Sequence, residues 1–178
     1  QIQARCIRSK PLIHRLAVSA TRGTPVDNLS NYDSSQERML YVAPVGQLRS
    51  DRLLFVTKTS MCKLVEGAEF DVAKRTIAST KLADEDELIF IGSASEMEQI
   101  VLQSHGGCFL RFLTQEVSTM KKTALGVRGM KLADDDYLEH AYLLAGHQEY
   151  TISYHDKEYA LNKVRLAKRD TKGIKPRI

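Results

Sequence analysis

Pairs of basic residues recur along the chain at an even spacing. Lys74-Arg75, Lys121-Lys122 and Lys168-Arg169 follow one another at intervals of 47 residues. Lysine and arginine side chains neutralise phosphate charges and release condensed counterions, and this needs no reaction centre. The charge is also uneven, with eight Lys or Arg against two acids in residues 157–178, and six acids without a base in residues 84–98. This asymmetry suggests a polyanion as partner.

Residues that could form a metal or catalytic site are present, but their spacing does not suit one. Cys6, Cys62 and Cys108 form no CxxC pair, and the five His do not fall at ligand spacings. The acid-rich stretches 84–87 and 134–136 lack the Gly and the distal Glu of a calcium loop. There is no Ser-His-Asp arrangement, phosphate-cradling glycine loop or dinucleotide fingerprint. We therefore expect no catalytic residue, no metal and no cofactor.

Length and composition predict one domain or one array of small units. The chain has 178 residues, of which 43% are apolar, and its net charge is +4. No apolar run reaches the 18 residues of a membrane span, and residues 1–10 lack the apolar core of a signal peptide. The three widely spaced cysteines suit reduced thiols, so we expect a cytoplasmic protein. Because the chain opens without Met, we interpret it as part of a longer protein.

A repeated phrase marks one corner of each structural unit. Lys-Leu-Ala-Asp occurs at residues 81–84 and again at 131–134, each time with acids behind it and an apolar run following. We expect the acids to lie in a tight turn where Asp side chains accept hydrogen bonds from free backbone N–H groups. Leu82 and Leu132 should face the core.

Three segments ahead of the basic pairs predict β-hairpins. Residues 53–65, 100–113 and 150–164 each contain an apolar or aromatic run, a short polar turn and a second apolar run. Branched and aromatic residues favour strands because they pack well on a pleated surface.

The order of these features predicts a repeating unit of about 47–50 residues. Each unit contains a hairpin, a link with a basic pair, a further strand, an acidic turn and a last strand, which we place at 37–45, 87–92 and 137–144. Four short strands per unit, without sustained helical periodicity, are typical of propeller-like blades. We expect an all-β fold with residues 1–178 as a single domain, in approximate blades 1–47, 48–95, 96–146 and 147–178, the first and last incomplete.

Several of these stretches resemble a known family. VAKRTIASTKLADEDEL (72–88), KKTALGVRGMKLADDDYL (121–138) and GTPVDNLSNYDSSQERMLYV (23–42) are similar to the C-terminal domain of the A subunit of bacterial type II topoisomerases, the group of DNA gyrase and topoisomerase IV. The resemblance covers nearly the whole chain. It implies a β-pinwheel, here of about four blades of four antiparallel strands that neighbouring blades share. It also implies that a basic perimeter binds and bends duplex DNA.

The resemblance further implies two protein partners and a subtype. The partners are the N-terminal cleavage domain of the same polypeptide and the ATPase B subunit of the holoenzyme. The catalytic Tyr of these enzymes lies in the cleavage domain, so no Tyr of this chain takes that role. Gyrase carries a Gln-Arg-Arg-Gly-Gly-x-Gly box in one blade, whereas KKTALG (121–126) and KRDTKG (168–173) each have one Gly and no Gln. This difference favours a topoisomerase IV-like protein.

The candidate DNA-binding residues are the basic pairs and the cations near them. They are Arg22, Lys74, Arg75, Lys121, Lys122, Arg128, Lys168, Arg169, Lys172 and Lys175. The competing interpretation of each is an ordinary solvated surface residue. The competing function for the whole domain is a propeller-like scaffold for protein partners, in which the charge is incidental.

Overall fold

The computed structural model describes residues 4–7, 28, 30–146 and 148–176, and its regular structure is mostly short β-strands. In chain order the strands are β1 (Arg5–Ile7), β2 (Arg52–Thr57), β3 (Met61–Glu66), β4 (Thr76–Ala78), β5 (Leu88–Ser93), β6 (Gln99–Ser104), β7 (Phe109–Leu113), β8 (Val127–Arg128), β9 (Met130–Lys131), β10 (Leu138–Leu144), β11 (Thr151–Tyr154), β12 (Lys157–Ala160) and β13 (Thr171–Lys172). The helical elements of the described residues are α2 (Val45–Ser50) and the 3-10 turns η1 (Gly67–Phe70), η2 (Thr114–Glu116) and η3 (Leu161–Lys163).

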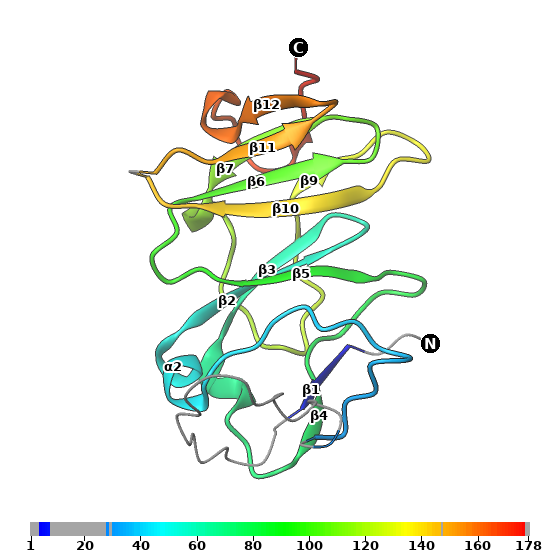
Figure 1. The fold of residues 1–178 in the computed structure, drawn as a ribbon, viewed down its shortest axis with the longest axis vertical. Helices are drawn as coiled ribbons and strands as arrows, with labels where there is room; N and C mark the ends of the chain where they lie inside the picture. Colours follow the sequence, from blue (N-terminus) through cyan, green and yellow to red (C-terminus); the bar gives the residue numbers. More distant parts are fainter. Residues whose placement is uncertain (1–3, 8–27, 29, 147, 177–178) are drawn as a thin grey trace, which may run out of the picture.

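These strands form small sheets that follow one another through the molecule. The largest has the order β5-β2-β3-β8 and the next β10-β6-β7, while β1 pairs with β4, β11 with β12 and β13 with β9. Figure 1 shows the sheets stacked along the long axis, from β1 and β4 at one end to β11 and β12 at the other. The three predicted hairpins are confirmed as β2–β3, β6–β7 and β11–β12.

Each of two hairpins is extended by a segment from the following unit. We call residues 117–131 the first crossover and residues 164–176 the second. In the first crossover, Val127 pairs antiparallel with Cys62 of β3, and Thr119 forms a parallel bridge with Leu64.

The second crossover repeats both contacts 47 residues further on. Ile174 pairs with Phe109 of β7, and Leu166 bridges Arg111. Neighbouring units therefore share strands, and the prediction of an all-β, propeller-like fold is confirmed. Within the described residues, the sheet β5-β2-β3-β8 has four strands. The sheet β10-β6-β7 has three, and the isolated bridge between Phe109 and Ile174 stands where its fourth strand would pair.

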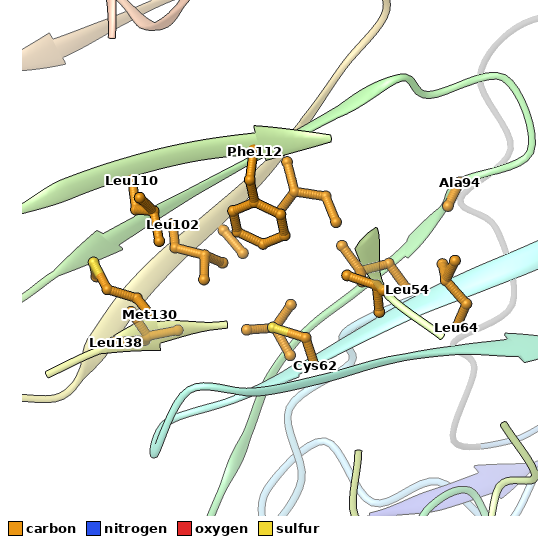
Figure 2. Close-up of a cluster of buried hydrophobic side chains, with 13 residues drawn as sticks. Leu54, Cys62, Leu64, Ala94, Leu102, Leu110, Phe112, Met130 and Leu138 are labelled. Carbon is orange, nitrogen blue, oxygen red and sulfur yellow. The ribbon is translucent and has the colours of Figure 1, made fainter. Parts of the chain in front are cut away.

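The core lies between successive sheets because strand residues alternate between two faces. Leu54 of β2 and Leu64 of β3 face Leu102 of β6 and Phe112 of β7 in one fully buried cluster, shown in Figure 2. Phe55, the residue after Leu54 in β2, belongs to a second cluster on the opposite side of the β2–β3 sheet. The β2–β3 sheet is thus covered on both faces, as stacked blades require.

The acidic turns have the predicted role. Asp86 accepts hydrogen bonds from the backbone N–H of Thr59, at 3.0 Å, and of Glu87, at 2.9 Å. Asp136 accepts in the same way from Gly106 at 2.8 Å and from Tyr137 at 2.9 Å. The first turn is thereby bonded to the tip of the β2–β3 hairpin and the second to the tip of the β6–β7 hairpin. Leu82 and Leu132 lie beneath these turns, packed against the buried clusters as expected: Leu82 on the cluster of Phe55, Leu132 on that of Leu54.

The prediction of a strand at residues 37–45 is wrong. Residues 38–44 form no strand, and Val45–Ser50 form the short helix α2. Pro44 explains the difference, because it has no N–H to donate to a sheet and its fixed φ suits the start of a helix. Its carbonyl accepts the first helical hydrogen bond from Leu48 at 3.0 Å. Leu40 and Tyr41 still pack against the cluster around Phe55.

Candidate nucleic-acid interface

The second member of the middle basic pair is bound to the preceding unit. The backbone N–H of Lys122 donates to Oε2 of Glu69 at 3.1 Å, and its Nζ donates to the backbone oxygen of Glu69, also at 3.1 Å. Glu69 lies in η1, directly after β3, so this contact fixes the first crossover beside the hairpin that it extends. We call this contact the Glu69 anchor. Lys122 is half-buried as a result.

The last basic pair repeats this arrangement. The backbone N–H of Arg169 donates to Oε2 of Glu116 at 2.9 Å, and its Nε donates to the backbone oxygen of Glu116 at 3.0 Å. Glu69 and Glu116 are 47 residues apart, as are Lys122 and Arg169. A further bond joins Nη1 of Arg169 to the backbone oxygen of Arg128 at 2.6 Å. We call this contact the Glu116 anchor. It gives the second member of the last pair a packing role, as the Glu69 anchor does for the middle pair.

The first member of each pair extends into solvent. The side chain of Lys121 is 82% exposed, with its Nζ 3.6 Å from Oε1 of Glu69, a distance and exposure at which an ion pair contributes little. Lys168 is also exposed. The Glu69 and Glu116 anchors are equivalent contacts, and each fixes the residue after the exposed lysine. Lys121 and Lys168 therefore lie at equivalent positions, the first beside β3 and the second beside β7. The prediction had not distinguished the two members of a pair.

Arg128 is exposed but paired with an acid of the next crossover. Its Nη2 donates to Oδ2 of Asp170 at 3.2 Å, and its Nε donates to Oδ1. The hydrogen bond from Arg128 holds the pKa of the Asp170 carboxyl below its usual value, and the same bond raises the pKa of Arg128. Lys172 and Lys175 are exposed on the second crossover.

The remaining predicted cations lie outside the two crossovers. Lys74 and Arg75 are exposed on the link that leads into β4. Arg22 lies outside the described residues. The structure thus joins Arg128 of the first crossover to Arg169 of the second, while Lys74 and Arg75 adjoin a different sheet.

Two exposed cations at the start of the second crossover were missed by sequence reasoning. Lys163 ends η3 and Arg165 follows it, and both are exposed. Lys163 comes 47 residues after Glu116, so η3 carries a cation where η1 and η2 carry their anchoring Glu. Aligning the segments that follow the hairpins, rather than only the basic pairs, would have found this position.

Other kinds of site are not seen in the described part of the chain. No group of three or more His, Cys, Asp or Glu lies where it could hold a metal ion among these residues. Among the same residues, no helix has the length and apolar character needed to cross a membrane.

Comparison with known proteins places the chain in a family. Residues 51–95 and 98–145, together more than half of the chain, match the model of the DNA gyrase C-terminal domain, described as a beta-propeller. The DNA gyrase A subunit of Salmonella typhimurium is 34% identical over 122 residues, which are 67% of this chain and 14% of that protein. The DNA topoisomerase 4 A subunit of Streptococcus pneumoniae is 26% identical over 153 residues, 82% of this chain and 18% of that protein. The chain thus spans less than a fifth of either relative.

Solved structures agree with the family match. The C-terminal domain of DNA topoisomerase IV superimposes with a TM-score of 0.64 at 26% identity, covering 70% of this chain and 41% of that one. The DNA gyrase A C-terminal domain gives a TM-score of 0.60 at 21% identity, over 71% of this chain and 44% of that one, which supports the fold. The chain therefore belongs to the DNA gyrase C-terminal domain family, the C-terminal domains of type II topoisomerase A subunits.

Proposed function

We propose that the domain binds duplex DNA without strong sequence preference and bends it along the edge formed by its crossovers. The observation that carries this proposal is the recurrence of an exposed lysine, Lys121 and then Lys168, at matching points of successive sheets. Each lysine directly precedes an anchored residue, so its backbone position is fixed by the Glu69 or Glu116 contact. A phosphate backbone that follows the stacked sheets meets one such cation per unit.

Bending requires contacts that form only as the duplex curves. Bending a site of 20–30 base pairs by 40–90° costs about 1–6 kcal/mol. Each phosphate contact made along a convex edge releases counterions and offsets part of this cost. Backbone contacts carry no sequence information, so the binding should tolerate many sequences. The proposed contacts in the described residues are the exposed lysines of the crossovers, Lys121, Lys168, Lys172 and Lys175, together with Lys74, the first member of the preceding basic pair, where the path would continue.

Salt dependence tests this proposal directly. Five contacts at about −0.9 each predict a slope of about −4 to −5 for the logarithm of the binding constant against the logarithm of the salt concentration. The measurement is a titration of a random duplex of about 40 base pairs between 50 and 200 mM salt. Absence of binding at 50 mM would overturn the proposal and favour a scaffold for protein partners.

Neutralising one lysine at a time locates the DNA path. Lys121→Gln and Lys168→Gln should each weaken binding and reduce the salt slope by about 1, with unchanged thermal stability. Arg38→Gln is the matched control, because Arg38 is an exposed cation whose Nη2 lies 3.5 Å from the backbone oxygen of Ile89 in β5, at the opposite edge of the sheet. An equal loss for the control would show that the crossovers are not the preferred path.

In the whole protein, the domain would present DNA to the rest of a type II topoisomerase. We propose two protein partners, the cleavage domain of the same polypeptide and the ATPase B subunit, in keeping with the type II topoisomerase polypeptides among its relatives. We also propose topoisomerase IV-like behaviour, because KKTALG and KRDTKG lack the Gln and additional Gly of the gyrase box. Relaxing plasmid DNA in the presence of the domain tests the subtype, since gyrase-like chiral wrapping would leave a large change in linking number.

A further inference from the structure

A buried lysine joins the first crossover to the preceding hairpin. Lys63 in β3 is only 2% exposed, which is rare for this residue type. Its Nζ donates to the backbone oxygens of Lys122 and Ala124, at 2.6 Å each. These two oxygens lie within the short turn that begins at Lys121, in which the N–H of Ala124 donates to the carbonyl of Lys121 at 2.9 Å.

Burying this amine is unfavourable compared with burying an apolar side chain, so packing alone does not explain a lysine here. Its Nζ lies 5.8 Å from the centre of the Phe55 ring. Burial lowers the pKa of Lys63 to about 8, and the charge of Glu69 acts against that lowering. A buried charge is often replaced by an apolar side chain without loss of stability. The following unit shows such a solution, since Leu110 occupies the corresponding place in β7, 47 residues on, and is also 2% exposed.

We propose that Lys63 is a positioning residue for the DNA-binding edge: its two hydrogen bonds fix the turn at 121–124 and thereby the point from which Lys121 meets a phosphate. This inference rests on the proposed function. The Glu69 anchor fixes the turn at Lys122, and Lys63 supplies a second point of attachment at Ala124. Two further hydrogen bonds hold the same segment, from the backbone N–H of Lys81 to the carbonyl of Lys122 at 3.1 Å and from that of Met120 to the carbonyl of Leu64 at 2.8 Å. The particular contribution of Lys63 is therefore its bond at Ala124, at the far end of the turn.

Hydrogen exchange tests the positioning without DNA. Lys63→Met keeps an unbranched side chain, one atom shorter, and removes the donors. We expect the backbone amides of residues 121–126 to exchange about tenfold faster than in the unaltered protein, while those of β2 and β3 keep their protection. Lys63→Leu, which copies Leu110, should give the same result and serves if the methionine variant folds poorly. Unchanged exchange at 121–126 in a folded variant would overturn the proposal.

A double-mutant cycle then tests the link to DNA. Lys63→Met should weaken duplex binding about three- to tenfold in the unaltered protein, and hardly at all when Lys121→Gln is already present. When Lys168→Gln is present instead, Lys63→Met should weaken binding by the same factor as in the unaltered protein. Equal losses in both backgrounds would show that Lys63 acts on general stability and not through Lys121. If the unaltered protein fails to bind DNA at all, the proposed function fails, while the exchange result still decides whether Lys63 positions the turn.

Discussion

The first and second crossovers follow the same backbone path but differ in charge. Both run beside the outer strand of a hairpin, and both are held by a Glu anchor 47 residues apart. In the first, Arg128 is paired with Asp170, and Leu125 fills the position that Lys172 takes in the second. In the second, Lys172 and the counterpart of Arg128, Lys175, are exposed. The repeat therefore conserves geometry more closely than it conserves charge.

The strongest shared constraint is a glycine in each crossover. A Cβ added to Gly126 would lie 2.7 Å from the backbone oxygen of Cys62, and one added to Gly173 would lie 3.0 Å from that of Phe109. Both crossovers thus pass a carbonyl of the preceding hairpin too closely for a side chain. Gly126 alone of the two has a positive φ, +108°, which other residues rarely adopt. The comparison therefore predicts unequal sensitivity at equivalent places.

We expect Gly126→Ala to give the largest loss of stability, about 3 kcal/mol, because strained φ and overpacking act together. Gly173→Ala should cost less, about 1 kcal/mol, because its φ is ordinary and its nearest contact, the Met130 sulfur at 2.7 Å, can move, which leaves contacts of 3.0 Å to the carbonyl of Phe109 and to Cβ of Cys108. Urea denaturation followed by circular dichroism measures both. Gly46→Ala is the control, because Gly46 is in α2 with no atom within 4 Å of the added Cβ, and alanine should be neutral or stabilising there. Equal losses of unfolding free energy for Gly126→Ala and Gly173→Ala would show that the positive φ of Gly126 adds nothing to its sensitivity.

Removing an anchor should have the next largest effect. Glu116→Ala leaves the backbone N–H of Arg169 without its carboxylate acceptor, and Glu69→Ala does the same to Lys122. We expect each to cost about 1–2 kcal/mol in the free energy of unfolding. Glu158→Ala, at an exposed position in β12, should change stability by less than about 0.5 kcal/mol. If the anchors were ordinary surface contacts, their losses would match that control.

The sequence pattern was sufficient for the hairpins and the acidic turns, whereas the sharing of strands was implied by the family resemblance. An apolar run followed by a polar turn is enough to indicate β2 and β6, which are buried along nearly their whole length. The bonds from Asp86 and Asp136 to the N–H of the next residue are local interactions, so these turns can also be inferred from short stretches. The strand expected at 37–45 was wrong because the effect of Pro44 on the backbone outweighed the apolar pattern around it.

The candidate site was less predictable because its contacts are distant in sequence. The acceptors of Lys122 and Arg169 lie 53 residues away, in η1 and η2, and no local pattern links them. The amine of Lys63 meets its acceptors 59 and 61 residues along the chain. A basic pair therefore indicates a cation at the surface, whereas only the fold separates the anchored member from the exposed one.

Releasing Arg128 should make the first crossover more like the second. Asp170 has a φ of +62°, which Asn also tolerates, so Asp170→Asn removes the charge while keeping the turn. Lowering the pH to protonate Asp170 would not be a suitable substitute for this mutation. The lowered pKa of Asp170 means that the pair stabilises the fold above the unfolded pKa of about 4 and is lost only as pH falls through the lower folded value.

With the carboxylate removed, we expect Arg128 to add one phosphate contact at neutral pH. Duplex affinity should rise about threefold at low salt and the salt slope should steepen by about 1, the smallest effect among these variants. Adding Arg128→Gln to Asp170→Asn should abolish the gain, which separates a new contact by Arg128 from a mere change in net charge. A gain that survives the second substitution would place Arg128 away from the DNA path, and the exposed cations of the second crossover would then carry most of the binding.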